Sequence, residues 1–197
     1  MTRETIIGYM LTALSGVMEN LSIEPRRISS SDRRVLEDII LPYFAKDIRF
    51  QKILFVGCAA YTRWYEKFFA MKEYWTIDYK KIKRKYGSPN HITDNITHVE
   101  KYFQPDYFDV IIMNGVIGYG LNHSIDIEAA IDACFMTLDR GGIFVLGWND
   151  HKRRKPVEIG NIQALKKFTE SYFDPLQTCH FKAEQTSGHT FSFYVKA

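Results

Sequence analysis

Two short stretches carry residues whose types and spacing suit the binding of a nucleotide-like ligand. The stretch from Gly57 to Tyr61 follows an apolar run and precedes residues at helical spacing. A tight turn from a buried strand into a helix aims N-terminal N–H groups at a ligand over the strand's carboxyl end. Asp78 ends the next apolar run, about 20 residues after Gly57, where an acid reaches the hydroxyls of a ribose. The alternative for Asp78 is a helix cap or a solvated loop acid.

The elements that would position these residues include several strands. Short apolar runs bounded by turn residues are typical of buried strands. The predicted strands cover residues 53–56, 74–78, 91–96, 107–113, 143–148, 178–183 and 189–195. The last two would form a hairpin around Thr186-Ser187-Gly188.

Helices are predicted between these strands. Apolar residues recur at helical spacing over residues 5–21, 35–44, 63–70, 127–138 and 162–172, and residues 23–28 form a linker. We expect Ser29 to Asp32 and Ser124 to cap helices, and Pro42 to kink or end one. The glycine turn at residues 139–142 should end another. The helix over residues 5–21 needs a partner surface, which could be the sheet, a substrate cleft or a second subunit.

Composition bounds the class of protein. With 197 residues, 46% of them hydrophobic, the chain can form one domain with its own core. The formal net charge of +3 is too small to indicate a nucleic-acid partner. The three cysteines lie far apart without a C-x-x-C pair, which favours a reducing compartment and argues against a disulfide or zinc framework. The N-terminus lacks the pattern of a signal peptide, and no long apolar run follows, so we expect a cytoplasmic protein without a membrane span or a metal site.

The order of these segments resembles the class I S-adenosylmethionine-dependent methyltransferases. In that family the first strand ends in a G-x-G-type loop, the second in a ribose-binding acid, and the third near the adenine. In the family the fourth strand leads to a loop near the reacting methyl group, and the corresponding strand here ends at Asn114. The family's turn before the fifth strand reads L-x-x-G-G, as do residues 138–142. The resemblance implies that S-adenosylmethionine contacts Gly57, Cys58, Ala59, Tyr61, Asp78, Tyr79, Asp94, Asn95 and Asn114.

The resemblance also implies a fold. We expect a doubly wound α/β protein with a mostly parallel seven-stranded sheet, an antiparallel C-terminal hairpin strand and N-terminal helices. Residues 1–31 would form a helical cap and linker, and residues 32–197 the Rossmann-like domain.

The glycine loop departs from the family pattern at three positions. Phe55 stands where the family usually has an acid that helps hold the ammonium end of the cofactor. Ala59 and Tyr61 replace later glycines, and alanine is tolerated only where φ is negative. The ring of Tyr61 could face the sulfonium of the cofactor, because the face of an aromatic ring attracts cations. The alternative is that Tyr61 is only a packing residue.

Methyl transfer requires mainly the positioning of two ligands and the exclusion of water, so no universal catalytic residue is expected. A base that takes a proton from the acceptor would lie on the loops at the strand ends. The candidates, each of which could equally be an ordinary loop residue, are Tyr119, His123, Asp150 and His151. The residues predicted to line an acceptor pocket are Tyr119, Trp148 and Asn149.

The absence of a large inserted domain favours a small-molecule acceptor with an oxygen or nitrogen nucleophile. Basic runs at residues 80–85 and 151–155 are solvated faces or suit an acidic or phosphorylated group. One alternative is a non-catalytic relative that serves as an interaction module, and another is a nicotinamide-dependent oxidoreductase, against which the missing G-x-G-x-x-G counts. Nucleic-acid methylation is disfavoured by the Asn114-Gly115-Val116-Ile117 exit of the fourth apolar strand. A monomer and a homodimer are both compatible with the sequence.

Overall fold

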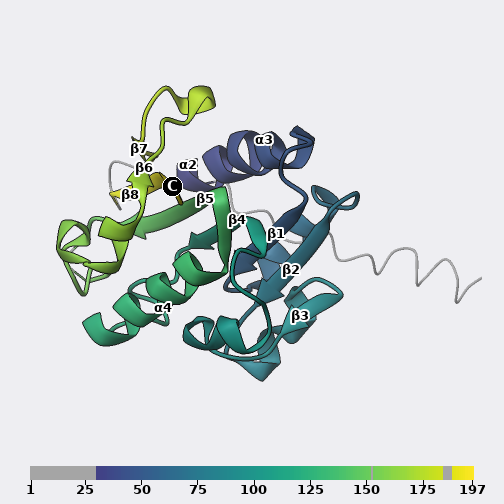
Figure 1. Cartoon of the computed structure of the whole chain (residues 1–197), viewed down its shortest axis with the longest axis horizontal. Coiled ribbons are helices and arrows are strands. Elements are labelled where there is room, and N and C mark those ends of the chain that lie inside the picture. The colour runs from purple at the N-terminus through teal and green to yellow at the C-terminus, as the bar shows by residue number, and fades with distance from the viewer. Residues whose placement is uncertain (1–29, 152, 184–187) are drawn as a thin grey trace, which may run out of the picture.

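The computed structural model describes residues 30–151, 153–183 and 188–197. In this part of the chain a single mixed sheet has the strand order β3-β2-β1-β4-β5-β8-β6, with β7 paired to β8 (Figure 1). The strands are β1 (Lys52–Val56), β2 (Glu73–Ile77), β3 (Asn90–Ile92), β4 (Phe108–Asn114), β5 (Leu138–Asn149), β6 (Thr169–Glu170), β7 (His180–Lys182) and β8 (His189–Val195). Strands β1 to β5 are parallel to one another, and β8 is antiparallel to β5, β6 and β7. The expected α/β sheet, mostly parallel with an antiparallel C-terminal strand, is confirmed, and the short β6 is added to it.

Helices cover both faces of this sheet (Figure 1). One continuous helical segment consists of α2 (Ser31–Val35), a π-helical turn (Leu36–Ile40) and α3 (Leu41–Lys46). The opposite face carries α4 (Ser124–Thr137). The remaining helical segments are 3-10 helices over Ala60–Lys67, Lys81–Tyr86, Ile96–Lys101, Ile159–Asn161, Ala164–Lys167 and Asp174–Leu176.

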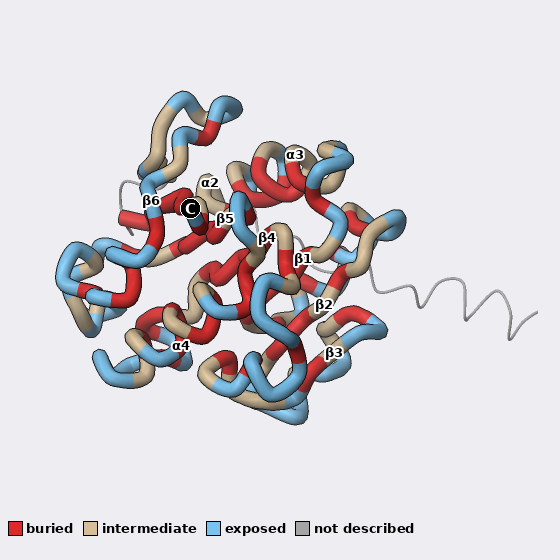
Figure 2. Tube along the Cα trace, in the orientation of Figure 1, coloured by how far each residue is buried: buried red, intermediate tan, exposed pale blue. Residues whose placement is uncertain are grey.

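The strands alternate their side chains between two apolar layers. On β1, Leu54 and Val56 join the layer under α4, while Ile53 and Phe55 join the layer under α2 and α3. Both faces of the central strands are covered, and these strands are predominantly apolar, as is typical of parallel sheets. Figure 2 shows the buried trace running along the strands and the exposed trace concentrated in the loops.

Several local predictions were wrong. The stretch expected as one helix over 162–172 instead contains the 3-10 helix Ala164–Lys167 and the strand β6, and Tyr172 is exposed. The residues expected as an α-helix over 63–70 instead belong largely to the 3-10 helix Ala60–Lys67.

Helix boundaries also differ from expectation. Pro42 does not end its helix but lies in the first turn of α3, directly after the π-helical turn. Ser124 is the first residue of α4 and not its cap, which is His123. Strand β5 starts at Leu138 with no separate glycine turn before it, and Gly141, at a φ of 76°, lies in an irregular stretch of that strand. The predicted helix over 5–21, the linker over 23–28 and the turn residues Thr186 and Ser187 lie outside the described residues.

Candidate functional site

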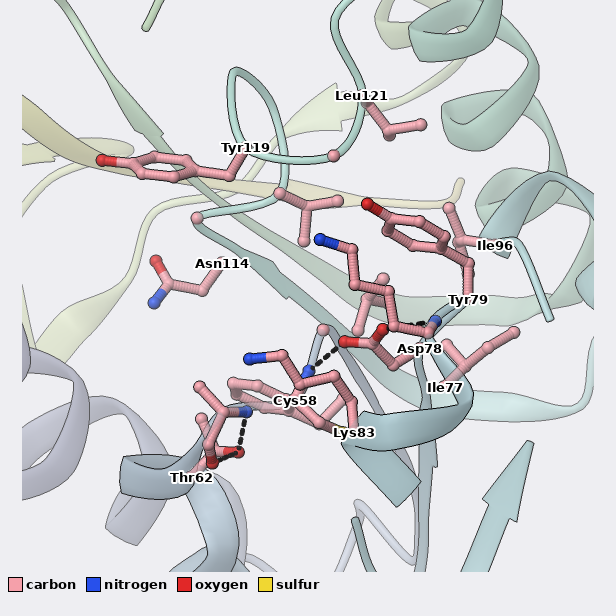
Figure 3. Close-up of a pocket in the computed structure, with 18 of the residues that line it drawn as sticks. Cys58, Thr62, Ile77, Asp78, Tyr79, Lys83, Ile96, Asn114, Tyr119 and Leu121 are labelled. Carbon is pink, nitrogen blue, oxygen red and sulfur yellow. Dashed lines mark hydrogen bonds between the residues drawn. The ribbon is translucent and has the colours of Figure 1, made fainter. Parts of the chain in front are cut away.

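A cavity of about 370 Å³ opens at the carboxyl ends of β1, β2 and β4 (Figure 3). Its volume lies at the lower end of the range of about 300–1,000 Å³ that is typical of small-molecule sites. Of the sequence-predicted cofactor residues, this first cavity is lined by Gly57, Cys58, Ala59, Tyr61, Asp78, Tyr79, Asp94, Asn95 and Asn114. The sheet order brings these residues together from four separate segments of the chain.

The turn after β1 is tied to the end of β2 through Asp78. The backbone N–H of Cys58 donates to Asp78 Oδ2 at 2.8 Å, and the N–H of Lys80 donates to Oδ1 at 2.9 Å (Figure 3 shows the first). Each carboxylate oxygen keeps a lone pair for a further donor. Gly57 has a φ of 88°, a conformation that favours glycine, and an added Cβ would lie 3.2 Å from Val116 Cγ2. Asp78 therefore braces the ligand loop and can still accept hydrogen bonds from a ligand.

The altered loop positions have physical explanations. Ala59 has a φ of −149°, an extended conformation that alanine adopts as readily as glycine. The N–H of Ala59 donates to Thr62 Oγ1 at 3.0 Å, which fixes the start of the 3-10 helix. Phe55 is buried, with its ring edge-on to Tyr65 at 5.4 Å between centroids, so this position lines the first cavity but offers no polar group to a ligand.

Arg33 belongs to α2, and its buried side chain lines the first cavity. The sequence patterns did not predict this position. The Arg33 guanidinium covers the ring of Tyr61, with Cζ 4.1 Å from the ring centroid, and Nη1 donates to the Tyr65 hydroxyl at 3.1 Å. The Tyr65 hydroxyl donates in turn to Glu37 Oε1 at 2.8 Å. Burial by itself would lower the pKa of Arg33, but Tyr65, Tyr61 and Asp32 together raise it above the ordinary value. The cavity wall therefore contains a permanent cation, and its Nε lies 4.0 Å from Oδ2 of Asp32.

The pair Asp94 and Asn95 lines the first cavity but uses its polar groups within the chain. Asp94 Oδ1 accepts from the N–H of Asn95 at 2.7 Å and lies 2.9 Å from His98 Nδ1, and Oδ2 accepts from Tyr102 at 2.9 Å. The hydrogen bond from His98 is the main cause that lowers the pKa of Asp94 to about 2. Asn95 Oδ1 caps the next 3-10 helix by accepting from the N–H of Thr97.

A second cavity, of about 630 Å³, adjoins the first. Four residues line both, namely Arg33, Tyr61, Gly115 and Tyr119. Gly115 has a φ of 65°, and a Cβ built on it would have no atom within 4 Å, so the space beside it is open. The remaining lining residues of the second cavity are Ser30, Asp32, Asn149, His151, Arg154 and His189.

A chain of polar side chains crosses the strand ends beneath the second cavity. His189 Nε2 lies 3.0 Å from Asn114 Oδ1, and His189 Nδ1 lies 2.9 Å from Asn149 Oδ1. Asn149 Nδ2 donates to the Tyr119 hydroxyl at 3.2 Å. Burial lowers the pKa of His189 to about 4, so the imidazole is neutral at neutral pH. This network fixes Tyr119 on the boundary between the two cavities.

Three of the predicted catalytic or acceptor residues lie elsewhere. Trp148 packs against the apolar layer under α4 and donates from Nε1 to Ser192 Oγ at 3.1 Å. Asp150 forms an ion pair with Lys155 at 2.7 Å, and His123 is the N-cap of α4. Within the described part of the chain, these three residues line neither cavity. Tyr119, Asn149 and His151 do line the second cavity.

Arg33, Arg154 and His189 line the cavities but were not among the residues predicted from the sequence. A sequence signal existed for His189, because a strand antiparallel to β5 must begin at the carboxyl end of β5. Arg154 belongs to the basic run 151–155, but nothing in the run distinguishes it from its neighbours.

Comparison with known proteins gives structural matches only, since no protein-family model and no curated protein sequence matches the chain. The N-methyltransferase NodS from Bradyrhizobium japonicum WM9, in complex with S-adenosyl-L-homocysteine, aligns with a TM-score of 0.64 at 16% identity. That alignment covers 92% of this chain and 97% of NodS. A TehB-like S-adenosylmethionine-dependent methyltransferase from Corynebacterium glutamicum aligns with a TM-score of 0.61 at 15% identity, covering 94% and 97% of the two chains.

A third similar structure is 1,6-didemethyltoxoflavin-N1-methyltransferase from Burkholderia thailandensis, with bound 1,6-didemethyltoxoflavin and S-adenosylhomocysteine. It aligns with a TM-score of 0.54 at 11% identity, covering 86% of this chain and 84% of that one. None of the helices in the described residues is long and apolar enough to cross a membrane. The three structural alignments show that the chain has the fold of the class I S-adenosylmethionine-dependent methyltransferases.

Proposed function

We propose that this protein binds S-adenosylmethionine in the first cavity and transfers its methyl group to a small molecule in the second. The observation that carries the proposal is the position of Asp78. Its carboxylate lies at the end of β2 and lines the first cavity. It also accepts a hydrogen bond from the N–H of Cys58 in the turn after β1. An acid in this position reaches the hydroxyls of a ribose bound over the turn.

The residues of the first cavity fit this cofactor without the usual acid before the loop. Asp78 would accept from the ribose hydroxyls, and Asn95 and Tyr79 would border the adenine. The buried guanidinium of Arg33 would bind the carboxylate of the methionine part, since a charge-assisted hydrogen bond favours a carboxylate partner. When bound, S-adenosylmethionine supplies an electrophilic methyl group.

The boundary between the cavities would control the transfer. Gly115 leaves open space where a side chain would otherwise stand, so an acceptor atom in the second cavity can approach the first. Tyr61 and Tyr119 line this boundary and would exclude water from it. Both ring nitrogens of His189 contact asparagine side chains, so His189 would position Asn114 and Asn149, while His151 on the exposed wall would take up a proton from the acceptor.

Calorimetric titration with S-adenosylmethionine, S-adenosylhomocysteine and NAD tests the proposal. We expect heat from the two sulfur ligands and none from NAD. Asp78→Ala should weaken binding of S-adenosylhomocysteine by about 10-fold or more, because hydrogen bonds to charged groups contribute about 1.5–3 kcal/mol. The matched control is Asp38→Ala, which removes an exposed carboxylate from the helical segment. Binding of NAD alone would favour the oxidoreductase alternative and contradict the proposal.

A further inference from the structure

The hydroxyl of Tyr119 has a free proton that the second cavity can use. Its oxygen accepts the hydrogen bond from Asn149 Nδ2 at 3.2 Å, and Asn149 is held in that orientation by His189. Because a phenol can both accept and donate, the O–H of Tyr119 remains available to a ligand. Tyr119 lines the second cavity, so this donor is placed to act there.

Arg154 adds a cation over the ring that carries this hydroxyl. Its guanidinium covers the Tyr119 ring, with Cζ 4.3 Å from the ring centroid, and Nη1 donates to the carbonyl of Gly118 at 3.0 Å. A guanidinium has five N–H donors, so most of them remain for a ligand. Among the ion pairs of the described residues, none involves Arg154, whereas Lys155 in the same basic run pairs with Asp150 at 2.7 Å and Glu158 at 2.8 Å.

The segment that carries Arg154 is closely packed against the loop that carries Tyr119. Gly118 has a φ of 81°, and a Cβ built on it would lie 2.1 Å from the carbonyl oxygen of Arg154. Arg153 and Arg154 are both exposed, but Arg154 lines the second cavity, whereas Arg153 lines neither cavity in the described chain. The basic run therefore directs one of its two arginines to the second cavity.

The charges around this cavity favour an anion. Two guanidinium groups, of Arg33 and Arg154, face one carboxylate, that of Asp32. Arg33 and Asp32 are 4.0 Å apart, so the excess positive charge lies on the side of Arg154 and Tyr119. A planar guanidinium beside a hydroxyl donor matches the geometry of a carboxylate or phosphate group.

We infer that the second cavity takes a methyl acceptor that carries a carboxylate or a phosphate, with Arg154 and the Tyr119 hydroxyl as its donors. The inference rests on the proposed function, because it treats the second cavity as the acceptor site. Both anions share the chemistry that the site recognises, so separate probes must distinguish them.

The test uses benzoate, phenyl phosphate and the uncharged benzamide as probes of the full chain saturated with S-adenosylhomocysteine. A ligand that binds only the folded state stabilises it by RT ln(1 + [L]/Kd), so fitting the rise of Tm with ligand concentration to this relation gives an apparent Kd. We expect benzoate or phenyl phosphate, but not benzamide, to raise the Tm of the wild type, and the stronger of the two identifies the anion. Arg154→Gln should weaken this binding by about 10-fold, the effect of one charge-assisted hydrogen bond, and Arg153→Gln should leave it unchanged.

Each outcome has a distinct meaning. If neither anion exceeds benzamide, or if Arg154→Gln behaves like Arg153→Gln, the inference is wrong. Tyr119→Phe provides a second variant, which should weaken anion binding while retaining the ring under Arg154. If S-adenosylhomocysteine itself fails to bind, the proposed function fails, and this first titration separates that result from failure of the anion site.

Discussion

His189 Nε2 lies 3.0 Å from Asn114 Oδ1, a contact that joins the first residue of β8 to the last residue of β4 across the end of β5. Asn149 donates to Tyr119 through Nδ2, so its Oδ1 must accept from His189 Nδ1. A neutral imidazole has only one N–H, so Nε2 must accept in its turn. Asn114 meets this requirement when its side-chain amide is turned by 180°, which brings Nδ2, otherwise buried without a partner in the described chain, to the position of Oδ1. The neutral state of His189 thus determines how both asparagines are oriented.

Replacing His189 should change how stability depends on pH. The pKa of His189 is about 4 in the folded protein, against about 6.5 for an unfolded chain, so only the unfolded state takes up this proton between those values. The neutral state of His189 therefore makes its full contribution to the free energy of unfolding above pH 6.5. This contribution is lost as pH falls towards 4, and the total loss is on the order of 3 kcal/mol. Urea unfolding at pH 7.5 and 4.5 should show this loss in the wild type and a smaller one in His189→Gln.

The control for this experiment is His123→Gln, which removes an exposed imidazole. It should retain the wild-type dependence on pH. An equal loss of stability in the wild type and in His189→Gln would show that His189 does not remain neutral in the fold.

Tyr65→Phe should destabilise the helical segment that carries Arg33. The Tyr65 hydroxyl accepts from Arg33 at 3.1 Å and donates to Glu37 at 2.8 Å, and the side chain is fully buried. Burial raises the pKa of Tyr65 above its ordinary value, so the phenol is protonated at any usable pH. Loss of a buried hydrogen-bonding partner costs about 1–3 kcal/mol in the free energy of unfolding, more when charged groups lose it.

Urea unfolding of Tyr65→Phe against Tyr86→Phe measures this cost. The Tyr86 side chain is only half-buried, so its hydroxyl should matter little. Calorimetry should also show weaker binding of S-adenosylhomocysteine to Tyr65→Phe, because Arg33 loses the group that orients it. If both the stability and the affinity for S-adenosylhomocysteine are unchanged, the Tyr65 hydroxyl does not orient Arg33.

Much of the first cavity could be predicted because it depends on strand order alone. Parallel strands end at one edge of a sheet, so residues after β1, β2 and β4 had to meet there. Gly57, Asp78 and Asn114 follow from this rule, and their predicted roles stay predictions until a ligand is bound.

The rest of the site depends on tertiary packing that local patterns do not contain. The pattern around Arg33 predicts a charged, solvent-facing helix residue, whereas the structure packs it on the Tyr61 ring and hydrogen-bonds it to the Tyr65 hydroxyl. Trp148 packs against the layer under α4, because Trp148 and Asn149 are neighbours on β5 and alternation sends only Asn149 towards the second cavity. The spacing of Ile162, Leu165 and Phe168 fits both an α-helix and a 3-10 helix, so the pattern could not decide between them.

Gly118→Ala should disrupt the attachment of the Arg154 segment. Its φ of 81° strains an alanine, and the new Cβ would collide with the carbonyl of Arg154 at 2.1 Å. Backbone strain of this kind costs on the order of 1–3 kcal/mol, and displacement of Arg154 should also remove the effect of benzoate or phenyl phosphate on Tm. The matched control is Gly160→Ala, where an added Cβ meets nothing within 4 Å.

Thermal unfolding with and without the anionic probes measures both effects. Wild-type behaviour in Gly118→Ala would mean that this contact does not hold Arg154 in place. If Gly118→Ala loses anion binding but keeps its affinity for S-adenosylhomocysteine, the two ligands bind at different sites.

The three thiols should differ in reactivity according to burial. Burial, and secondarily the nearby Asp78 carboxylate, raises the pKa of Cys58 to about 12, and burial also raises the pKa of Cys134. The thiolate is the reactive form, so both should react slowly with a disulfide reagent at pH 8, whereas the half-buried Cys179 should react first. Cys179→Ser should abolish the fast phase and Cys58→Ser should retain it. A fast phase that survives in Cys179→Ser and disappears in Cys58→Ser would show that the turn after β1 opens readily, contrary to the bracing by Asp78.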